Sequence, residues 1–500
     1  MRGLKVALCV ALAACGPRAP EGTVFYASGA DLQSISPLVT VHPLARQVQK
    51  YVLLTTLVRY DSLLRPAPYL ATAWAWSPDR RSLTFTLRRD LRWSDGRPTT
   101  SADVAYTLDA ARDTVTGYPR VGELACLNRV AASDRWTVRL DWCAPQPALP
   151  DVLTDLAILP AHRTGAAFLD RPLGNGPFRF VSHEPGRRWV FEANPDFPAA
   201  LGGPPAIRRL VIVVVDEATT KLAGLVTGEL DFAGILPMHA QVVRRIRGLA
   251  VREYPILLTY GIAWNTGRPP FDDVRLRRAL TMAIDRRQIV AAYLYGYGTV
   301  ANGPVPPDDP LAVPVPAIPF DRDHAAALLD SLDWRAGPDG VRRRDGRPLA
   351  FTLTTVGTAD NMLEQLIQAD LGAVGVRVRI RQLEMGAFLA AASSPARDYD
   401  ALVTGFTGDL DLAYLRGMFD SRRRGGALQY AQYADPAVDR AFDAGDMGAV
   451  QRIVARDVPV TFLYHARGLQ GVRTRVRNVT LDLRGELVNV ARWRLDARAP

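Results

Sequence analysis

Helical and strand signals alternate along the whole chain, and this alternation constrains the fold more than any other feature of the sequence. Leu83–Leu87 alternates between apolar and polar residues, and Leu210–Val215 is a continuous apolar run, typical of a strand buried on both faces. Asp273 can cap a long helix with apolar residues on one face. Because 500 residues exceed one ordinary hydrophobic core, the sequence predicts a mixed α/β fold with helices packed on sheets in more than one lobe.

The N-terminus has the features of an export signal. Arg2 and Lys5 accompany an apolar run at residues 6–14, which is too short to span a bilayer. Its end, LAACG at residues 12–16, resembles the lipobox of bacterial lipoproteins. We therefore expect residues 1–14 to be a lipoprotein signal peptide and Cys15 to carry a lipid that anchors the protein to a membrane surface. An ordinary signal peptide that is cut elsewhere is the alternative.

The positive charge of the chain comes almost entirely from arginine. The net charge is +10, and loss of Arg2 and Lys5 with the signal peptide leaves +8. A basic chain can indicate nucleic-acid binding, but here the arginines are scattered between aspartates, with Arg422–Arg424 as the one tight run. We therefore expect no nucleic-acid partner and attribute the arginine content to the codon usage of a GC-rich genome.

Two further cysteines, Cys126 and Cys143, flank a segment that alternates like two strands around a turn at residues 131–135. In a hairpin centred on that turn, residues whose numbers add up to 269 face each other, as these two cysteines do. A cross-strand disulfide is therefore expected in an oxidising compartment. Two free buried thiols remain the alternative, because the register can slip by one residue.

The longest motif in the chain spans residues 70–108, which read LATAWAWSPDRRSLTFTLRRDLRWSDGRPTTSADVAYTL. This segment resembles the signature of the family 5 extracellular solute-binding proteins, the oligopeptide-, dipeptide- and nickel-binding group. LVTGELD at residues 225–231 and PPFDDVRLRRALTMAIDR at residues 269–286 resemble further motifs of that family. The resemblance covers residues 24–500.

The resemblance implies a two-lobed periplasmic-binding-protein-like fold of type II, cluster C, with an extra inserted domain. Lobe I would be discontinuous and consist of residues 15–60, 171–265 and 477–500. The inserted domain II would occupy residues 61–170, and lobe II, also called domain III, residues 266–476. The two lobes would close on a ligand by a hinge motion.

The same resemblance implies the function. We expect a monomeric protein, in the periplasm or at the cell surface, that captures short peptides in a cleft between the lobes and delivers them to the inner-membrane permease subunits of an ABC importer. It would not be an enzyme and would need no cofactor or metal. The connections near residues 265 and 476 would act as the hinges.

The stretch from Tyr399 to Asp409 resembles the family pattern in which a final aspartate grips the amino terminus of a peptide. That role maps onto Asp409, with Asp411 as its rival if the alignment shifts. Asp409 could instead only cap the helix that follows it. The other candidate ligand-binding residues are Phe406, which replaces a tryptophan that flanks the peptide, and Gly405, Thr407, Asn265, Trp264 and Tyr433.

Other ligands and one other class of function stay open. The partner of a ligand carboxylate is not identified, and Arg422–Arg424 are candidates only by their nearness in sequence. Cleft aromatics such as Phe406 and Tyr414 leave oligosaccharide binding open, and an opine, a metal chelate or haem are further alternatives. A hydrolase acting on peptides or esters is the alternative of another class, although the chain has neither H-E-x-x-H nor G-x-S-x-G.

Overall fold

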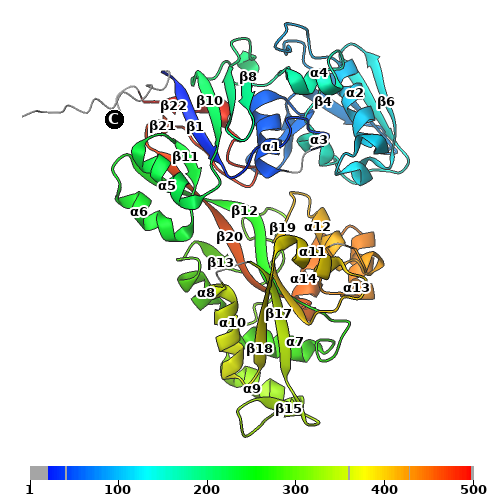
Figure 1. Cartoon of the computed structure of the whole chain (residues 1–500). Helices are drawn as coiled ribbons and strands as arrows, with labels where there is room; N and C mark the ends of the chain where they lie inside the picture. Colours follow the sequence, from blue (N-terminus) through cyan, green and yellow to red (C-terminus); the bar gives the residue numbers. More distant parts are fainter. Residues whose placement is uncertain (1–20, 40–41, 358–360, 427, 497–500) are drawn as a thin grey trace, which may run out of the picture.

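The structure is a computed structural model that describes residues 21–39, 42–357, 361–426 and 428–496. The expected signal peptide and the expected lipid-anchor residue, Cys15, lie outside these residues. Figure 1 shows two lobes, drawn one above the other and joined by two long strands. Within the described ranges, no helix is long and apolar enough to cross a membrane.

An eleven-stranded mixed sheet runs through both lobes. Its order is β18-β17-β19-β12-β20-β11-β1-β10-β9-β8, and β13 pairs with β20. The central strands are rich in apolar residues because helices cover both faces. The strands of this sheet are β1 (Thr23–Ser28), β8 (Phe178–Glu184), β9 (Arg188–Ala193), β10 (Arg209–Val214), β11 (Phe232–Gly234), β12 (Leu249–Trp264), β13 (Gly298–Val300), β17 (Ala350–Val356), β18 (Arg377–Leu383), β19 (Ala401–Thr407) and β20 (Val460–Arg473).

The strands β12 and β20 connect the lobes, and each belongs to both of them. The first half of β12 pairs with the last half of β20, which also pairs with β11 of the N-terminal lobe. From Leu258 onward, β12 pairs with β19 of the second lobe. The register between β12 and β20 shifts between Pro255 and Thr259. The crossing therefore lies inside the strands, whereas the sequence predicted it near residues 265 and 476, where the strands end.

A separate four-stranded antiparallel sheet, ordered β4-β5-β7-β6, lies within the range expected for the inserted domain. Helix α2 packs on this sheet and begins with the predicted capping box between Thr100 and Asp103. Asp103 also accepts a hydrogen bond of 3.3 Å from the buried indole of Trp93. The elements of this domain are β4 (Ala71–Trp76), β5 (Ser82–Leu87), α2 (Ser101–Arg112), β6 (Leu127–Asp134), β7 (Thr137–Trp142), α3 (Val152–Asp155) and α4 (Gly165–Asp170).

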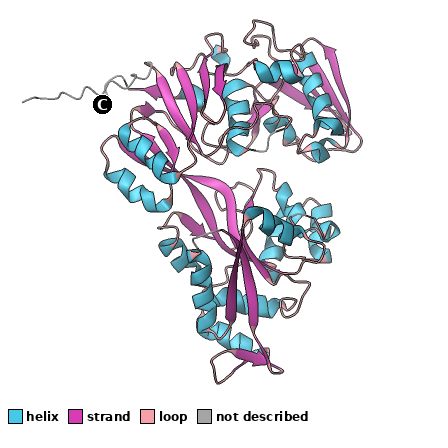
Figure 2. Ribbon diagram, viewed as in Figure 1, coloured by secondary structure: helices cyan, strands magenta, loops and turns pink. Residues whose placement is uncertain are grey.

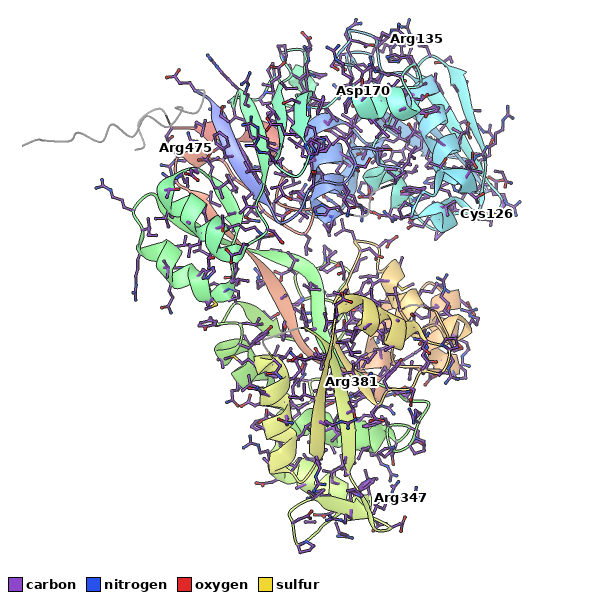
Figure 3. All side chains as sticks on the ribbon, in the orientation of Figure 1. Cys126, Arg135, Asp170, Arg347, Arg381 and Arg475 are labelled. Atoms are coloured by element: carbon purple, nitrogen blue, oxygen red, sulfur yellow. A yellow bond between two sulfur atoms is a disulfide. The ribbon has the colours of Figure 1, made fainter. Side chains whose placement is uncertain are left out.

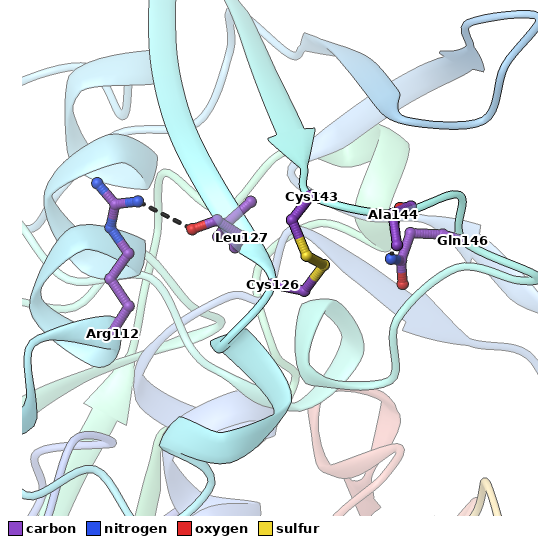
Figure 4. The surroundings of a disulfide bond; sticks show 6 residues. All are labelled: Arg112, Cys126, Leu127, Cys143, Ala144 and Gln146. Atoms are coloured by element: carbon purple, nitrogen blue, oxygen red, sulfur yellow. Dashed lines mark hydrogen bonds between the residues drawn. A yellow bond between two sulfur atoms is a disulfide. The ribbon is translucent and has the colours of Figure 1, made fainter.

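Cys126 and Cys143 form a disulfide at the base of the β6–β7 hairpin, with Cα atoms 5.1 Å apart (Figure 4). The adjacent pair Leu127 and Trp142 has the predicted register, but bulges shift the register between Leu127 and Arg129 and again between Ala132 and Asp134. The turn predicted at residues 131–135 is wrong, because β6 continues to Asp134 and the strands are joined by residues 135–136. Arg112 of α2 donates a hydrogen bond of 3.0 Å to the carbonyl of Leu127. The disulfide therefore fixes the strand ends beside the helix that covers them.

The rest of the N-terminal lobe consists of short helices and two small strand pairs. Figure 2 shows α5 and α6 beside the sheet, on the side away from the inserted domain. These elements are α1 (Pro43–Gln47), the π-helix η1 (Val48–Leu53), β2 (Val58–Tyr60), β3 (Pro66–Pro68), α5 (Ala218–Thr227), α6 (Ala240–Arg245), β21 (Val476–Arg477) and β22 (Arg494–Leu495). The 3-10 helices of the whole chain are η2 (Thr114–Thr116), η3 (Val121–Leu124), η4 (Ala199–Leu201), η5 (Pro237–His239), η6 (Ser421–Arg423) and η7 (Val490–Arg492).

The second lobe has one hydrophobic core on each face of its sheet. Along β12, Ile262 and Trp264 belong to the core with α7, α9 and α10, whereas Ala263 belongs to the core with α11 to α14. Successive strand residues point to opposite faces, so both must be apolar. The elements are α7 (Val274–Ala283), α8 (Arg286–Ala292), α9 (Arg322–Ser331), β14 (Arg335–Ala336), β15 (Arg342–Arg344), β16 (Arg347–Pro348), α10 (Met362–Ala373), α11 (Met385–Ser393), α12 (Ala413–Phe419), α13 (Pro436–Asp443) and α14 (Met447–Asp457).

The arginines are spread over the whole molecule. Figure 3 shows Arg135 and Arg475 at distant points of the N-terminal lobe, and Arg381 and Arg347 along the second lobe. Many form ion pairs with aspartates close in sequence, such as Arg343 with Asp339. This distribution agrees with the absence of a basic stripe in the sequence.

Candidate functional site

A cavity of about 510 Å³, here called the main cavity, lies between the two lobes beside the strands that connect them. Its size is in the range of small-molecule sites. The connecting strand β12 contributes Tyr254–Leu257, and the end of β19 with the following turn contributes Thr407–Leu410. The N-terminal lobe and the inserted domain supply the other walls, with charged and tyrosine side chains at Arg46, Lys50, Tyr51, Arg59, Tyr60, Arg120, Glu123, Asp151, Asp155, Asp482, Arg484 and Glu486.

Asp409 lies in the turn between β19 and α12. Its Oδ2 accepts a hydrogen bond of 3.1 Å from the backbone N–H of Tyr414 in α12. Its Oδ1 is buried and receives no hydrogen bond from an N–H or hydroxyl donor of the described residues, and the carboxyl group of Asp411 lies within hydrogen-bonding reach of the Asp409 carboxyl. Burial, followed by a side-chain hydrogen bond with Asp411 and by charge repulsion from Asp411 and Asp151, raises the pKa of Asp409 to about 8. One oxygen therefore caps the helix, as the alternative interpretation expected, while the other is available to a hydrogen-bond donor in the main cavity.

Carboxylates of the inserted domain approach Asp411 from the opposite lobe. Burial raises the pKa of Glu123, and Asp411 adds to this rise, against the lowering effect of Arg120. Arg120 donates hydrogen bonds of 2.7 Å to Glu123 and 2.9 Å to Asp151. This end of the main cavity therefore carries several carboxylates and one guanidinium that is already shared between them. A positively charged ligand group would relieve the repulsion.

Asp155 lines the same cavity in a different electrostatic environment. Its carboxylate pairs with Arg46, with Lys50 at 2.9 Å and with Arg120 at 3.1 Å. Burial alone would raise the pKa of Asp155, but Lys50, Arg46 and Arg120 together lower it well below its usual range. This group is a saturated ion-pair cluster that fixes the inserted domain against α1 and η1.

Two other predicted residues lie beside Asp409. Thr407 is exposed and lines the main cavity. Gly405 is packed closely, since an added Cβ would lie 3.1 Å from side-chain atoms of both Leu258 and Tyr260. Phe406 is buried in the core next to Tyr430, with ring centroids 6.1 Å apart, and does not line the main cavity. The expected ligand contact of Phe406 is corrected accordingly.

The structure places three further predicted residues in the interior, so their expected ligand contacts are also corrected. Trp264 is fully buried and donates its indole N–H to Thr461 at 2.9 Å. Asn265 donates to two backbone carbonyls, at 3.0 and 2.9 Å. Tyr433 is buried and donates its hydroxyl to Asp457 at 2.6 Å. In each case the strand or turn that carries the residue directs its side chain into the core.

The predicted arginine run is not part of the main cavity. Arg422 pairs with Asp420 and Asp443, and none of Arg422–Arg424 lines the main cavity. The cations that do line it come from the N-terminal lobe and, in the case of Arg120, from the inserted domain, and no sequence motif singled them out. One feature of the sequence could have pointed to Lys50: it is one of only three lysines in an arginine-rich chain.

Two lobes that share a pair of connecting strands and enclose a polar cavity define the class of extracytoplasmic solute-binding proteins. Residues 65–425 match the model of the bacterial extracellular solute-binding proteins, family 5. The chain belongs to this family, whose members are binding proteins of ABC importers and not enzymes.

Relatives and solved structures agree with this assignment. Protein XP55 of Streptomyces lividans is 29% identical over 86% of this chain and 81% of its own length. A probable di/tripeptide-binding protein of Pseudomonas aeruginosa is 26% identical over 89% of this chain and 86% of its own. The NikA structure from Brucella suis, in complex with Fe(III)-EDTA, has 21% identity and a TM-score of 0.84, with 95% of this chain and all of that chain covered. The fold is therefore that of the two-lobed family 5 binding proteins.

Proposed function

We propose that the protein captures short peptides in the main cavity and delivers them to the permease of an ABC importer. The lobes would close around the peptide by bending at the two connecting strands. In this proposal residues 1–14 are removed, Cys15 carries the lipid anchor, and the mature protein works as a monomer in the periplasm or at the cell surface. The similarity to a probable di/tripeptide-binding protein supports a peptide as the ligand.

The unpaired Oδ1 of Asp409 is the observation that carries the proposal. A buried carboxyl oxygen without a partner is costly, and a donor that enters the main cavity recovers that cost. The ammonium group of a peptide offers both the donors and the charge that suit this acidic end. A peptide of any sequence has this group, so the contact binds the ligand without selecting side chains.

The raised pKa of Asp409 gives this contact a measurable proton linkage. With a pKa of about 8 in the empty cavity, most molecules carry a proton on Asp409 at pH 7. An ammonium group bound at Oδ1 favours the ionised carboxylate and lowers that pKa. Peptide binding at neutral pH therefore releases a proton from Asp409.

Calorimetric titration with alanine peptides of two to five residues tests the proposal. Each peptide is used with a free and with an acetylated amino terminus. The wild-type protein is expected to bind the free form and to lose affinity for the acetylated form by about 30-fold or more, as expected for loss of one partner of a buried charge pair. Asp409→Asn is expected to lose a similar factor for the free peptides.

The matched control is Asp398→Asn, which removes an exposed aspartate of the same lobe that pairs only with Arg268 at the surface. This variant is expected to bind like wild type. Equal affinity of wild type and Asp409→Asn for free peptides would remove Asp409 from the site. Mass spectrometry of the ligand that co-purifies with the protein provides a second test, since a sugar, an opine or a metal chelate in place of a peptide would refute the proposal.

A further inference from the structure

A second cavity, of about 430 Å³, adjoins the main cavity within the N-terminal lobe. The two cavities share Tyr51, Arg59, Tyr60 and Arg484 in their walls. The second cavity continues along β2 and β3 to the segment near Arg492. These shared side chains form the boundary between the two spaces.

The charges at this boundary are opposite to those around Asp409. Asp61 is the one acidic residue in the wall of the second cavity, and Arg65 neutralises it through hydrogen bonds of 3.0 and 2.9 Å. Arg484 forms a two-hydrogen-bond pair with Asp482 and donates to the carbonyl of Tyr60 at 3.0 Å. The side chain of Arg484 is therefore fully engaged.

Arg59 differs from the other cations of the main cavity because its guanidinium has no carboxylate partner. Within the described part of the chain, it forms no ion pair and no side-chain hydrogen bond, and its guanidinium carbon lies 5.0 Å from the centroid of the Tyr69 ring. Its side chain is partly buried. An aromatic face holds a guanidinium in place while the N–H groups at its edge remain free to donate.

We infer that Arg59 binds the terminal carboxylate of the peptide, and that the second cavity receives the end of the ligand that carries it. This inference rests on the proposed function and deepens it, because it fixes the direction of the ligand. The amino terminus lies at Asp409 in the second lobe, and the carboxyl terminus lies at Arg59 in the N-terminal lobe. The ligand class is then short peptides with both termini free.

The other cations of the main cavity are poor candidates for the same role. Arg46, Lys50 and Arg120 all pair with Asp155, and Arg120 also binds two further carboxylates. A ligand carboxylate at any of them would have to compete with a resident aspartate. Arg59 binds a carboxylate without breaking an existing ion pair, and its planar guanidinium can form two parallel hydrogen bonds with it.

Calorimetric titration with alanine peptides of two to five residues, each as the free acid and as the carboxyl-terminal amide, tests this inference. The wild-type protein is expected to bind the acid at least about tenfold more tightly than the amide, the usual scale for hydrogen bonds to a charged group. Arg59→Gln is expected to bind both forms with the same affinity, close to that of wild type for the amide. Arg59→Lys keeps the charge and is expected to retain part of the preference.

The matched control is Arg188→Gln, which removes a half-exposed arginine of the N-terminal lobe that pairs with Glu184 and lines neither cavity. It is expected to keep the full preference for the acid. Thermal melting of each variant without peptide establishes that it is folded, and Arg59→Lys provides the comparison if Arg59→Gln does not fold.

The outcomes separate the two proposals. If the peptides bind and Arg59→Gln and Arg59→Lys keep the wild-type ratio of acid to amide affinity, Arg59 does not bind the carboxylate, while the proposed function stands. If the ratio is near one already in wild type, the inference also fails. If none of the peptides binds to wild type, the proposed function fails and the inference fails with it.

Discussion

Asp155 and Asp409 line the same cavity, yet their environments are opposite. Asp155 is surrounded by Arg46, Lys50 and Arg120, which lower its pKa well below the usual range in spite of its burial. Asp409 is buried next to other carboxylates, which raise its pKa to about 8. The first carboxylate has every partner that it needs, whereas the second has an oxygen without one.

The difference separates a structural aspartate from a candidate ligand-binding one. Ion pairs of Asp155 with Arg46 and Lys50 hold the inserted domain to the N-terminal lobe, while its pair with Arg120 lies within the inserted domain. Asp409 makes no ion pair within the described residues, and in the proposed function the ammonium group of the peptide takes that place. A strongly shifted pKa alone does not mark a site. The direction of the pKa shift, taken together with the number of partners that the carboxylate already has, distinguishes a candidate ligand-binding aspartate from a structural one.

The largest expected effect is on stability and comes from Asp155. Asp155→Asn leaves three cations without their common anion, and the free energy of unfolding is expected to fall by about 3 kcal/mol. Because the folded-state pKa of Asp155 is lowered, this contribution is present at pH values above the ordinary pKa of about 3.9 and is lost as the pH falls toward the folded-state value. Urea unfolding at pH 7 measures the change. A loss under about 1 kcal/mol would mean that the cluster is not structural.

Asp409→Asn is expected to behave in the opposite way to Asp155→Asn: its stability without peptide should hardly change, but its stabilisation by peptide should largely be lost. Without peptide, its free energy of unfolding should remain within about 0.5 kcal/mol of wild type, because Asp409 is already largely protonated at pH 7. With peptide at 100 times the wild-type dissociation constant, wild type gains about 2.7 kcal/mol, whereas a variant with about 30-fold weaker affinity should gain no more than about 0.9 kcal/mol. Thermal unfolding with and without peptide measures both quantities. If peptide stabilised wild type and Asp409→Asn equally, Asp409 would not bind the peptide, and the distinction between it and the structural Asp155 would fail.

The third effect is on the pH dependence of binding. Since the raised pKa of Asp409 falls when an ammonium group binds, the affinity for peptide is expected to rise with pH by up to about tenfold per unit between pH 5 and 7. The rise should end near pH 8, where the peptide amine itself loses its proton. Titrations in buffers with different ionisation enthalpies should report release of nearly one proton at pH 7, and Asp409→Asn should release none.

The smallest effect is expected from Asp411→Asn. Asp411 is the second cause, after burial, of the raised pKa of Asp409. Its neutralisation should lower that pKa, so that fewer protons are released at pH 7 and the affinity depends less on pH. Glu253→Gln is a control, because Glu253 pairs with Arg467 outside the main cavity. Unchanged proton release in Asp411→Asn would show that Asp411 does not contribute to the raised pKa of Asp409.

Local signals in the sequence predicted local structure well. The capping box of Thr100 and Asp103 depends on residues three apart, and it is present. The pairing of Cys126 with Cys143 followed from the symmetry of one hairpin, and the disulfide is formed. The family resemblance also led to Asp409, because that motif includes both the strand and the turn that follows it.

The same sequence gave no means to tell which side chains near Asp409 face the cavity. Phe406 and Trp264 lie on strands with a core on both faces, so neither their polarity nor their position distinguishes a cavity side chain from a core one. Arg59 and Lys50 are brought to the main cavity by contacts between segments far apart in the chain. Which cations are already paired, as Lys50 is with Asp155 and Arg59 is not, depends on those distant contacts and cannot be read from neighbouring residues.

The two connecting strands have a mechanical consequence. Because β12 and β20 are hydrogen-bonded to each other on both sides of the crossing, they bend as one ribbon and not as two independent linkers. Such a ribbon resists stretching and shear but allows twisting and bending where the register shifts, between Pro255 and Thr259. In the proposed closure, this ribbon would limit the lobes to rotation near the register shift and would return Asp409 to a similar position relative to Arg59 each time.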